Sequence, residues 1–482
     1  MKTLFRLVPV VFVLLLVTVL VRTYQVVSLQ LPSRSFQPIF FDEKSSAEIL
    51  SRTLQFKTIS FQDESQTDQS QFDALIAFLQ EAFPAFHRAA RQELFNDRHL
   101  LYTWEGSDPS LKPVLFMGHI DVVPVSDESI WEQPAFAGII ENGYIWGRGA
   151  IDDKSTVTGL LNSAEVLIKS GFRPERTIVF AFGGDEETGG RQGATQIAQT
   201  LKQRGITFEF ILDEGGAITQ GVVEGADKPV ALIGIAEKGY VSLELKVQTQ
   251  GGHSSMPSAQ TAIGILSAGL ARLEKHQMPT RLELPQQEMF RYLAPEMPFI
   301  KRMVISNLWL FEPLVKQKMS ATASGNAAIR TTTAITMFNS GIKENVLPTD
   351  AIAVVNFRIL PGDSVDSVME HVRNVISDKR IEISNLSIQQ EPSGISDISS
   401  IGYAKLAQSI RDIYPGVVVT PYLVVGATDS RHYSELSNNI FRFMPVRMTP
   451  EDLKRFHGDN ERIAIKDYSY LVQFYMQLIK AL

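Results

Sequence analysis

Carboxylate and imidazole side chains gather in four short polar clusters of this sequence, and these residues are the ones best suited to chemistry. The clusters hold His119 and Asp121 in GHIDVVP, Asp152 in GRGAIDDK, Glu186 and Glu187 in GGDEETGG, and Asp213 in ILDEGG. Taken singly, each cluster has an ordinary explanation, such as a helix cap, a solvated turn or a core histidine. Together they would concentrate negative charge in a crevice of low dielectric, which is unfavourable unless a cation neutralises it. Because the chain has no cysteine, histidine, aspartate and glutamate must bind any such cation.

The segments around these clusters alternate between strand-like and helix-like patterns. Residues 113–121, 176–182 and 208–212 are short apolar runs typical of buried strands, and residues 154–170 and 192–203 have helical periodicity. This alternation predicts an α/β fold with a mostly parallel central sheet and helices on both faces. Ligands bind beyond the carboxyl ends of strands in such sheets, so we expect the four clusters to meet in one crevice.

The pattern changes near Lys238, where a second type of domain is predicted. Residues 241–248 alternate strictly, 261–276 and 364–377 are helix-like, and 345–360 and 381–388 are strand-like. These segments favour a smaller α+β lid domain over residues 238–393. It would be inserted into a catalytic domain made of residues 40–237 and 394–482.

Charge and composition exclude several function classes. The 482 residues include 46 Lys and Arg against 53 Asp and Glu, a net charge of -7, whereas nucleic-acid binding normally requires a basic face. We therefore expect no nucleic-acid partner. The glycine-rich segment GGDEETGGRQG lacks the Lys-Ser/Thr ending of a phosphate-binding loop, which argues against nucleotide binding.

The N-terminus has the order of basic and apolar residues that is typical of a targeting segment. Lys2 and Arg6 precede an apolar run over residues 7–21, and Arg22 closes it. A helix of that length spans ~22 Å, short of the ~30 Å hydrocarbon core, so a cleaved signal and a short uncleaved anchor both fit. We therefore expect residues 1–30 to be a signal sequence or an N-terminal membrane anchor. The protein would be exported, or tethered to a membrane through residues 7–21, with its catalytic domain outside the cytoplasm.

Seven motifs in this order resemble those of one metallopeptidase family. They are GHIDVVP, GRGAIDDK, GGDEETGG, LDEGG, GGHSSMP, NVLPTDA and HGDNERI. The chain looks like the co-catalytic zinc peptidase family of aminoacylases, carboxypeptidase S and succinyl-diaminopimelate desuccinylases. Its segments RTTTAITMFNSGIKENVLPTDA and VVNFRILPGDSV are most similar to the carboxypeptidase S branch, which includes N-fatty-acyl-amino-acid hydrolases.

The resemblance implies a dinuclear zinc centre, in which cobalt or manganese could replace zinc. Asp152 and a shared water or hydroxide would bridge the two ions. His119 and Asp213 would complete one site, and Glu187 and His457 would complete the other. Nitrogen and oxygen ligands of this kind suit zinc, and a pair of ions ~3.5 Å apart needs a bridging carboxylate.

The resemblance also assigns residues around the ions. Glu186 would be the general base and acid, because a carboxylate that binds no metal must accept the proton of the nucleophilic water. Asp121 would orient the ring of His119. Family members place a cis peptide after the bridging aspartate, here Asp152-Asp153.

Four further residues complete the expected substrate site. His253 in GGHSSMP would donate to the oxyanion, either after domain closure or from the partner subunit of a homodimer formed through the lid domain. Asn345, Arg358 and Arg431 look like the family's clamp for the substrate carboxylate and carbonyl. Each also has a plainer explanation, as a surface histidine or an ordinary surface ion pair.

Residues 285–320 are unusually apolar for a segment between two strands. Core packing is the default interpretation. The alternative is a groove for an apolar acyl chain, since Met and aromatic side chains line adaptable sites.

These observations predict a zinc-dependent hydrolase of an amide bond next to a free carboxylate. It would be a carboxypeptidase or an N-acyl-amino-acid amidohydrolase acting on a peptide or an N-acyl amino acid. Two alternatives remain open at this stage. One is a metal-dependent phosphoester hydrolase, because carboxylate-rich dinuclear sites also support that reaction, and the other is a tethered binding protein with an inactive site.

Overall fold

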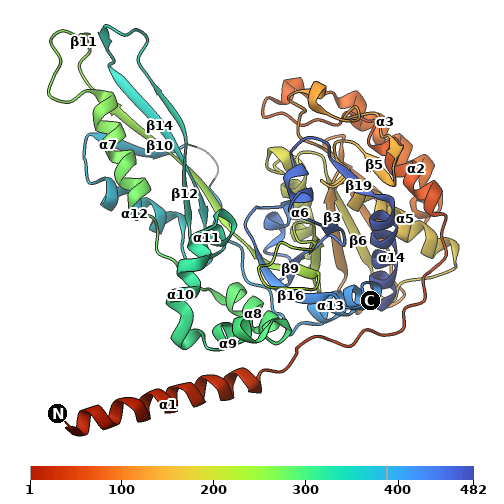
Figure 1. Ribbon diagram of the computed structural model, residues 1–482. Helices are drawn as coiled ribbons and strands as arrows, with labels where there is room; N and C mark the ends of the chain where they lie inside the picture. Colours follow the sequence, from red (N-terminus) through yellow and green to blue (C-terminus); the bar gives the residue numbers. More distant parts are fainter. Residues whose placement is uncertain (1, 387–388) are drawn as a thin grey trace.

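The computed structural model describes residues 2–386 and 389–482, which form two units and a projecting N-terminal helix (Figure 1). The larger unit contains a ten-stranded sheet with strand order β1-β2-β6-β3-β7-β17-β9-β8-β18, and β16 also pairs with β9. At its centre β3 (Val114–His119) lies parallel to both β6 (Ile178–Gly183) and β7 (Ile211–Asp213). The predicted mostly parallel sheet is confirmed.

The remaining strands of the larger unit are shorter or lie nearer its edges. In the main sheet they are β1 (Arg91–Phe95), β2 (His99–Trp104), β8 (Ile218–Thr219), β9 (Val230–Glu237), β16 (Val418–Val424), β17 (Ile440–Arg442) and β18 (Arg447–Met448). A separate three-stranded sheet consists of β4 (Ile140–Glu141), β5 (Tyr144–Trp146) and β19 (Arg462–Ala464).

Helices cover both faces of the main sheet, because successive residues of a buried strand point in opposite directions. The helices are α2 (Glu43–Thr53), α3 (Gln69–Ala82), α4 (Pro84–Ala89), α5 (Lys154–Lys169), α6 (Ala194–Gln203), α13 (Ile401–Ile413) and α14 (Ile465–Ala481). Phe116 of β3 belongs to one hydrophobic cluster with Leu161 of α5 and Tyr475 of α14. The next residue, Met117, belongs to another cluster with Ile197 of α6. Figure 1 shows α5 and α14 on one side of β3 and β6, and α6 on the other.

The smaller unit, here called the lid unit, is an antiparallel sheet covered by helices. Its strands lie in the order β12-β14-β10-β15. The elements are β10 (Gly239–Gln248), β11 (Gly252–His253), α7 (Ala262–Lys275), β12 (Thr332–Ser340), β13 (Val346–Leu347), β14 (Asp350–Ile359), α12 (Val365–Ile376) and β15 (Ile381–Asn385). Leu243 and Phe357 from the sheet pack with Leu266 and Val372 from the two helices. This is the expected α+β arrangement, although the last predicted strand included residues 387 and 388, which lie outside the described residues.

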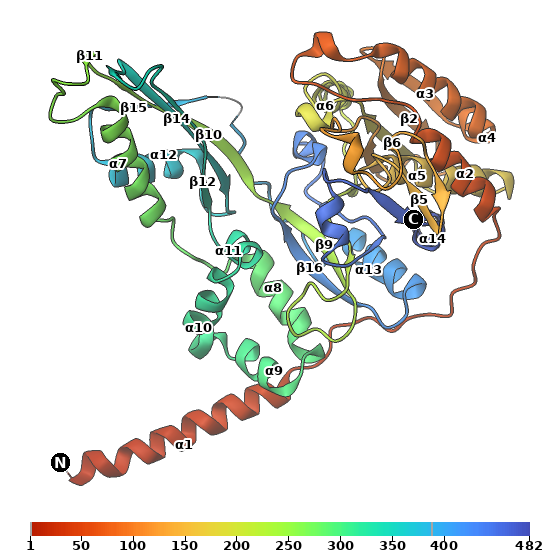
Figure 2. The same ribbon diagram turned by 45° about the horizontal axis from the view of Figure 1, so that its top comes forward.

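A helical segment connects α7 to β12 and lies beside the larger unit (Figure 2). It consists of α8 (Leu284–Leu293), α9 (Phe299–Ser306), α10 (Leu308–Ser320) and α11 (Ala323–Ile329). Part of it is core, because Leu293 and Met297 pack with Leu232 and Val418 of the large sheet. Trp309 is exposed, in contrast. Core packing therefore explains only part of this apolar segment.

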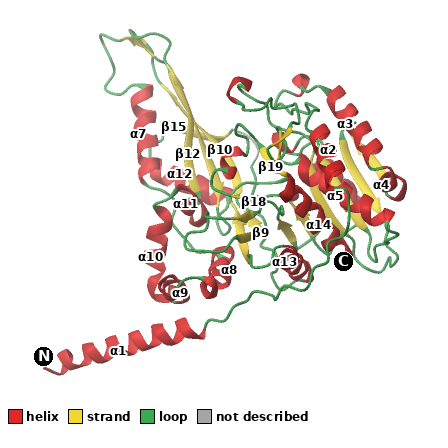
Figure 3. Cartoon of the chain, turned by 45° about the vertical axis from the view of Figure 1, so that its right-hand side comes forward, coloured by secondary structure: helices red, strands yellow, loops and turns green. Residues whose placement is uncertain are grey.

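The N-terminal helix α1 (Lys2–Gln25) extends away from both units and touches the protein at its C-terminal end (Figure 3). The chain then runs in an extended form to α2, fixed on the way by a hydrogen bond from the Arg34 amide to Asp412, 2.7 Å. In the part of the chain that the structure describes, no helix is both long and apolar enough to cross a membrane.

Candidate metal centre

The polar clusters converge at the carboxyl ends of the central strands. His119 ends β3, Glu187 lies in the turn after β6, and Asp152 lies two residues before α5. His457 comes from the loop before β19, far away in the sequence. Two groups of potential metal ligands result: His119, Asp152 and Glu214 form one, and Asp152, Glu187 and His457 form the other.

Asp152 belongs to both groups. Its Oδ1 lies 2.9 Å from Nε2 of His119, and its Oδ2 lies 3.1 Å from Nε2 of His457. The same His457 nitrogen lies 3.1 Å from Oε2 of Glu187, and Nε2 of His119 lies 3.4 Å from Oε1 of Glu214. Because its two oxygens face different histidines, Asp152 is placed to bridge two cations. The Asp152-Asp153 peptide is cis, as predicted.

The structure places a different carboxylate from the predicted Asp213 in the ligand group of His119. Asp213 is still part of β7, and its Oδ2 accepts a hydrogen bond from the Ser430 amide, 2.9 Å. Glu214 is the first residue beyond the strand and takes the place that we predicted for Asp213. Neighbouring residues at a strand end point to opposite sides, so a shift of one residue exchanges their roles.

We expect Glu214→Ala to remove about half of the bound metal, because it deletes a ligand of the His119 group. Asp213→Ala should retain the metal content of the wild-type protein, since that carboxylate faces the Ser430 amide. Metal analysis of both purified variants tests this assignment. Loss of metal in Asp213→Ala alone would restore the assignment predicted from the sequence.

Asp121 does more in the site than orient the ring of His119. Nδ1 of His119 lies 3.0 Å from the backbone carbonyl oxygen of Asp121 and 3.4 Å from its Oδ1. The carboxylate also accepts hydrogen bonds from the backbone amides of Glu186 and Glu187, both 3.2 Å, and from the Ser60 hydroxyl. Asp121 therefore ties the end of β3 to the loop that carries the predicted base.

Glu461 is a positioning residue that the sequence reasoning missed. Its fully buried carboxylate accepts hydrogen bonds from the amides of Gly149, Ile151 and Asp152 at 2.7 to 3.0 Å. It also pairs with Arg148 at 2.8 Å. Its position in the HGDNERI motif, four residues after His457, was the available signal. These contacts couple the loop of Asp152 to the segment that carries His457.

The electrostatics of the site favour a cation. Burial, together with the charge of Asp152, raises the pKa of Glu214 to about 8. Hydrogen bonds to Asp152 and Glu187 raise the pKa of His457 to about 10. Oε1 of Glu187 is buried and has no hydrogen-bond partner among the described residues. Carboxylates held this close are stable as anions only beside positive charge, so the residues fit a pair of divalent metal ions.

Glu186 belongs to neither group of ligands, although it is adjacent to both. Burial raises its pKa well above the usual range, and the charges of Asp429, Glu214 and Glu187 add to the effect. A carboxyl group with a raised pKa that binds no metal has the properties of a general acid and base.

The predicted substrate residues lie in two separate places. His253 and Asn345 are together at the tip of the lid unit, where the Ser254 amide donates to the Asn345 carbonyl oxygen, 3.2 Å. The label β11 marks this tip, far from β3 (Figure 1). His253 is exposed and contacts the Ser255 hydroxyl, 2.7 Å, and none of its contacts among the described residues reaches the metal groups. Its role stays a prediction.

Arg358 and Arg431 approach each other across the two units. Arg358 lies on β14, with its guanidinium 4.9 Å from the ring centre of Tyr240. Burial lowers the pKa of Arg358, and the charge of Arg431 lowers it further. Such a pair of like charges is a favourable place for an anion.

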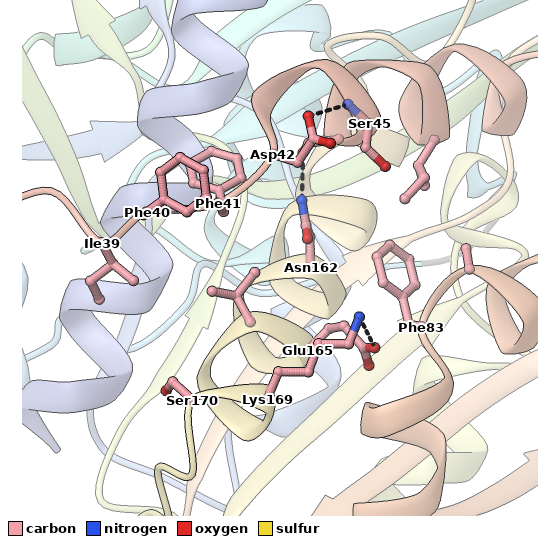
Figure 4. A pocket seen from close by; sticks show the side chains of 14 residues that line it. Ile39, Phe40, Phe41, Asp42, Ser45, Phe83, Asn162, Glu165, Lys169 and Ser170 are labelled. Atoms are coloured by element: carbon pink, nitrogen blue, oxygen red, sulfur yellow. Dashed lines mark hydrogen bonds and ion pairs between the residues drawn. The ribbon is translucent and has the colours of Figure 1, made fainter.

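Two cavities on the surface lie away from the metal ligands. One, of about 410 Å³, is lined by residues of α2 and α5, among them Ser45, Asn162 and Glu165 (Figure 4). The other, of about 450 Å³, lies near β1 and α6. Neither includes a member of the two metal groups.

Comparison with known proteins places this chain in a family. A family profile described as Peptidase family M20/M25/M40 matches residues 115–481. The chain is 42% identical over 443 residues to a Xenopus tropicalis protein named N-fatty-acyl-amino acid synthase/hydrolase PM20D1, which covers 91% of this chain and 86% of that protein. It is 32% identical over 490 residues to carboxypeptidase S of Saccharomyces cerevisiae, with 90% and 84% covered.

The fold is similar to that of solved structures as well. The crystal structure of an M20 family metallo-carboxypeptidase from Sulfolobus solfataricus matches with a TM-score of 0.66 and 19% identity, over 91% of this chain and 99% of that one. Human carnosine dipeptidase 1 matches with a TM-score of 0.61 and 17% identity, over 91% and 96%. The two-unit architecture is therefore shared by these proteins.

Proposed function

This chain belongs to the metallopeptidase family M20/M25/M40, and on that premise we propose that it hydrolyses the amide bond of an N-acyl amino acid or a peptide, next to a free carboxylate. The observation that carries the proposal is the arrangement of Asp152, whose two oxygens face His119 and His457. Glu186 beside it is a carboxyl group that neither ligand group uses. The names of the two relatives support both substrate classes.

We propose zinc as the metal, because imidazole and carboxylate ligands suit it. His119, Asp152 and Glu214 would hold one ion, and Asp152, Glu187 and His457 the other. When bound, the ions polarise the substrate carbonyl and lower the pKa of a coordinated water.

The protein's own residues supply the proton transfers and the orientation. Glu186 accepts the proton of the attacking water and delivers it to the leaving amine as the C–N bond breaks. Its raised pKa favours the second step, because burial makes the carboxyl group hold a proton more tightly than a solvated carboxyl group does. Asp121 keeps Glu186 in place through the hydrogen bond to its backbone amide.

Arg358 and Arg431 are proposed to bind the substrate carboxylate. An anion between them relieves the repulsion of their charges and accepts charge-assisted hydrogen bonds. Replacing either by alanine should lower kcat/KM for an N-acyl amino acid about 10- to 100-fold, mainly through KM. The same substrate with its carboxylate converted to an amide should be hydrolysed poorly, and to the same extent, by the wild-type protein and by both variants. Arg291→Ala, which changes a surface pair with Glu288, serves as the control.

A panel of N-acyl amino acids, dipeptides and p-nitrophenyl phosphate, assayed at one zinc concentration, tests the reaction class. We expect hydrolysis of one of the first two groups, loss of activity with a chelator and recovery with zinc. Turnover of the phosphoester alone would contradict the proposal.

A further inference from the structure

We propose that α1 and the exposed faces of α9 and α10 form one surface that docks on a lipid bilayer containing anionic headgroups. The helical segment of α8 to α11 would thus contact the membrane together with the N-terminal helix. This goes beyond a tether formed by residues 7–21 alone, and it does not depend on the proposed hydrolase activity.

The first observation is that α1 is apolar on every side. The five consecutive residues from Val10 to Leu14 are each 54 to 63% exposed, and five consecutive positions of a helix cover its full circumference. A protein groove covers one face of a helix, whereas acyl chains surround all of them. The helix therefore fits a lipid phase better than a protein partner.

The second observation is that α1 is fixed to the helical segment. The buried Asn307, between α9 and α10, donates through Nδ2 to the Val19 carbonyl oxygen, 3.2 Å, and to the Thr23 hydroxyl, 3.1 Å. The rings of Tyr24 and Phe299 also pack with their centres 5.7 Å apart. Because α1 is held in this way, insertion of α1 into a bilayer brings α9 and α10 to the same surface.

The exposed side chains of α9 and α10 suit that position. Ile300 is 65% exposed, Trp309 51% and Leu314 46%, and Nε1 of Trp309 donates to Oδ1 of Asn307, 3.2 Å. Aromatic and aliphatic side chains beside basic residues are typical of helices that lie in a membrane interface. Asn307 thus links Trp309 directly to α1.

The charge of these segments differs in sign from that of the whole chain. Residues 299–320 contain four basic residues and one acidic residue, and residues 1–41 contain four basic residues and none that is acidic. The net charge of the chain is -7. Local basic charge of this kind attracts anionic headgroups.

Trp309 offers a direct test. The other tryptophans, Trp104, Trp131 and Trp146, are buried, so Trp309 is the exposed one. The full-length protein is mixed with vesicles of equal parts phosphatidylcholine and phosphatidylglycerol with brominated acyl chains. We expect its fluorescence to fall and shift to shorter wavelength, and W309F, which removes the reporter, to show neither change.

Flotation of the same vesicles supplies a second measurement. Ile300→Glu combined with Leu314→Glu should lower partition about tenfold. Ile342→Glu, at a 96% exposed residue on the lid unit, should leave partition unchanged. The proposal is overturned if the protein does not float. It is also overturned if the protein floats while the emission of Trp309 stays the same, or if that emission changes with protein concentration in the absence of lipid, which would indicate an interface between copies.

Discussion

Glu186→Gln is expected to lower kcat about 10²- to 10⁴-fold while both metal ions remain bound. Glutamine keeps the size of the side chain and the backbone hydrogen bond from residue 186 to Asp121, 3.2 Å. It loses the carboxylate oxygen that accepts and returns a proton. Because Glu186 belongs to neither ligand group, the metal content should not change. Steady-state kinetics on an N-acyl amino acid, combined with metal analysis, measures both quantities.

The neighbouring residue provides the matched control. Glu187→Gln weakens a ligand 3.1 Å from His457, so it should lose metal from that group as well as activity. Different metal contents in these two variants with similar loss of turnover would separate proton transfer from metal binding. If Glu186→Gln keeps wild-type kcat, the proposed role of Glu186 is wrong.

Glu461→Ala should have the largest effect on stability, about 3 to 5 kcal/mol in the free energy of unfolding. The substitution leaves the buried Arg148 without its carboxylate partner and removes the acceptor of three buried amides around Asp152. Urea denaturation followed by circular dichroism measures the change. The variant should also bind metal more weakly, because the loop of Asp152 loses its support.

Glu451→Ala is the appropriate comparison for Glu461→Ala. Glu451 pairs with Lys454 on the surface, where both side chains are exposed, and such pairs contribute about 0 to 1 kcal/mol. Equal stability of the two variants would show that the contacts of Glu461 are not important for the fold.

The sequence was sufficient to predict the central sheet and the convergence of its polar clusters. The strands that end at His119 and before Glu186 are fully buried apolar runs, so composition alone indicates them, and parallel pairing brings their carboxyl ends together. The choice between Asp213 and Glu214 depended on where β7 ends, which hydrophobicity does not reveal.

Contacts between distant segments were also beyond the reach of sequence patterns. The role of Glu461 depends on the path of the chain between His457 and β19, which brings its carboxylate to the amides around Asp152. The packing of α1 on Asn307 joins residues nearly 300 positions apart. No periodicity in either segment indicates such a pairing.

The metal content of the purified protein tests the central claim most directly. Zinc should be bound at two ions per chain, and at about one per chain in His457→Ala, since that variant retains the group of His119, Asp152 and Glu214. A zinc-saturated wild-type protein that holds no ion, or a His457→Ala variant with the full wild-type content, would contradict a dinuclear centre bridged by Asp152.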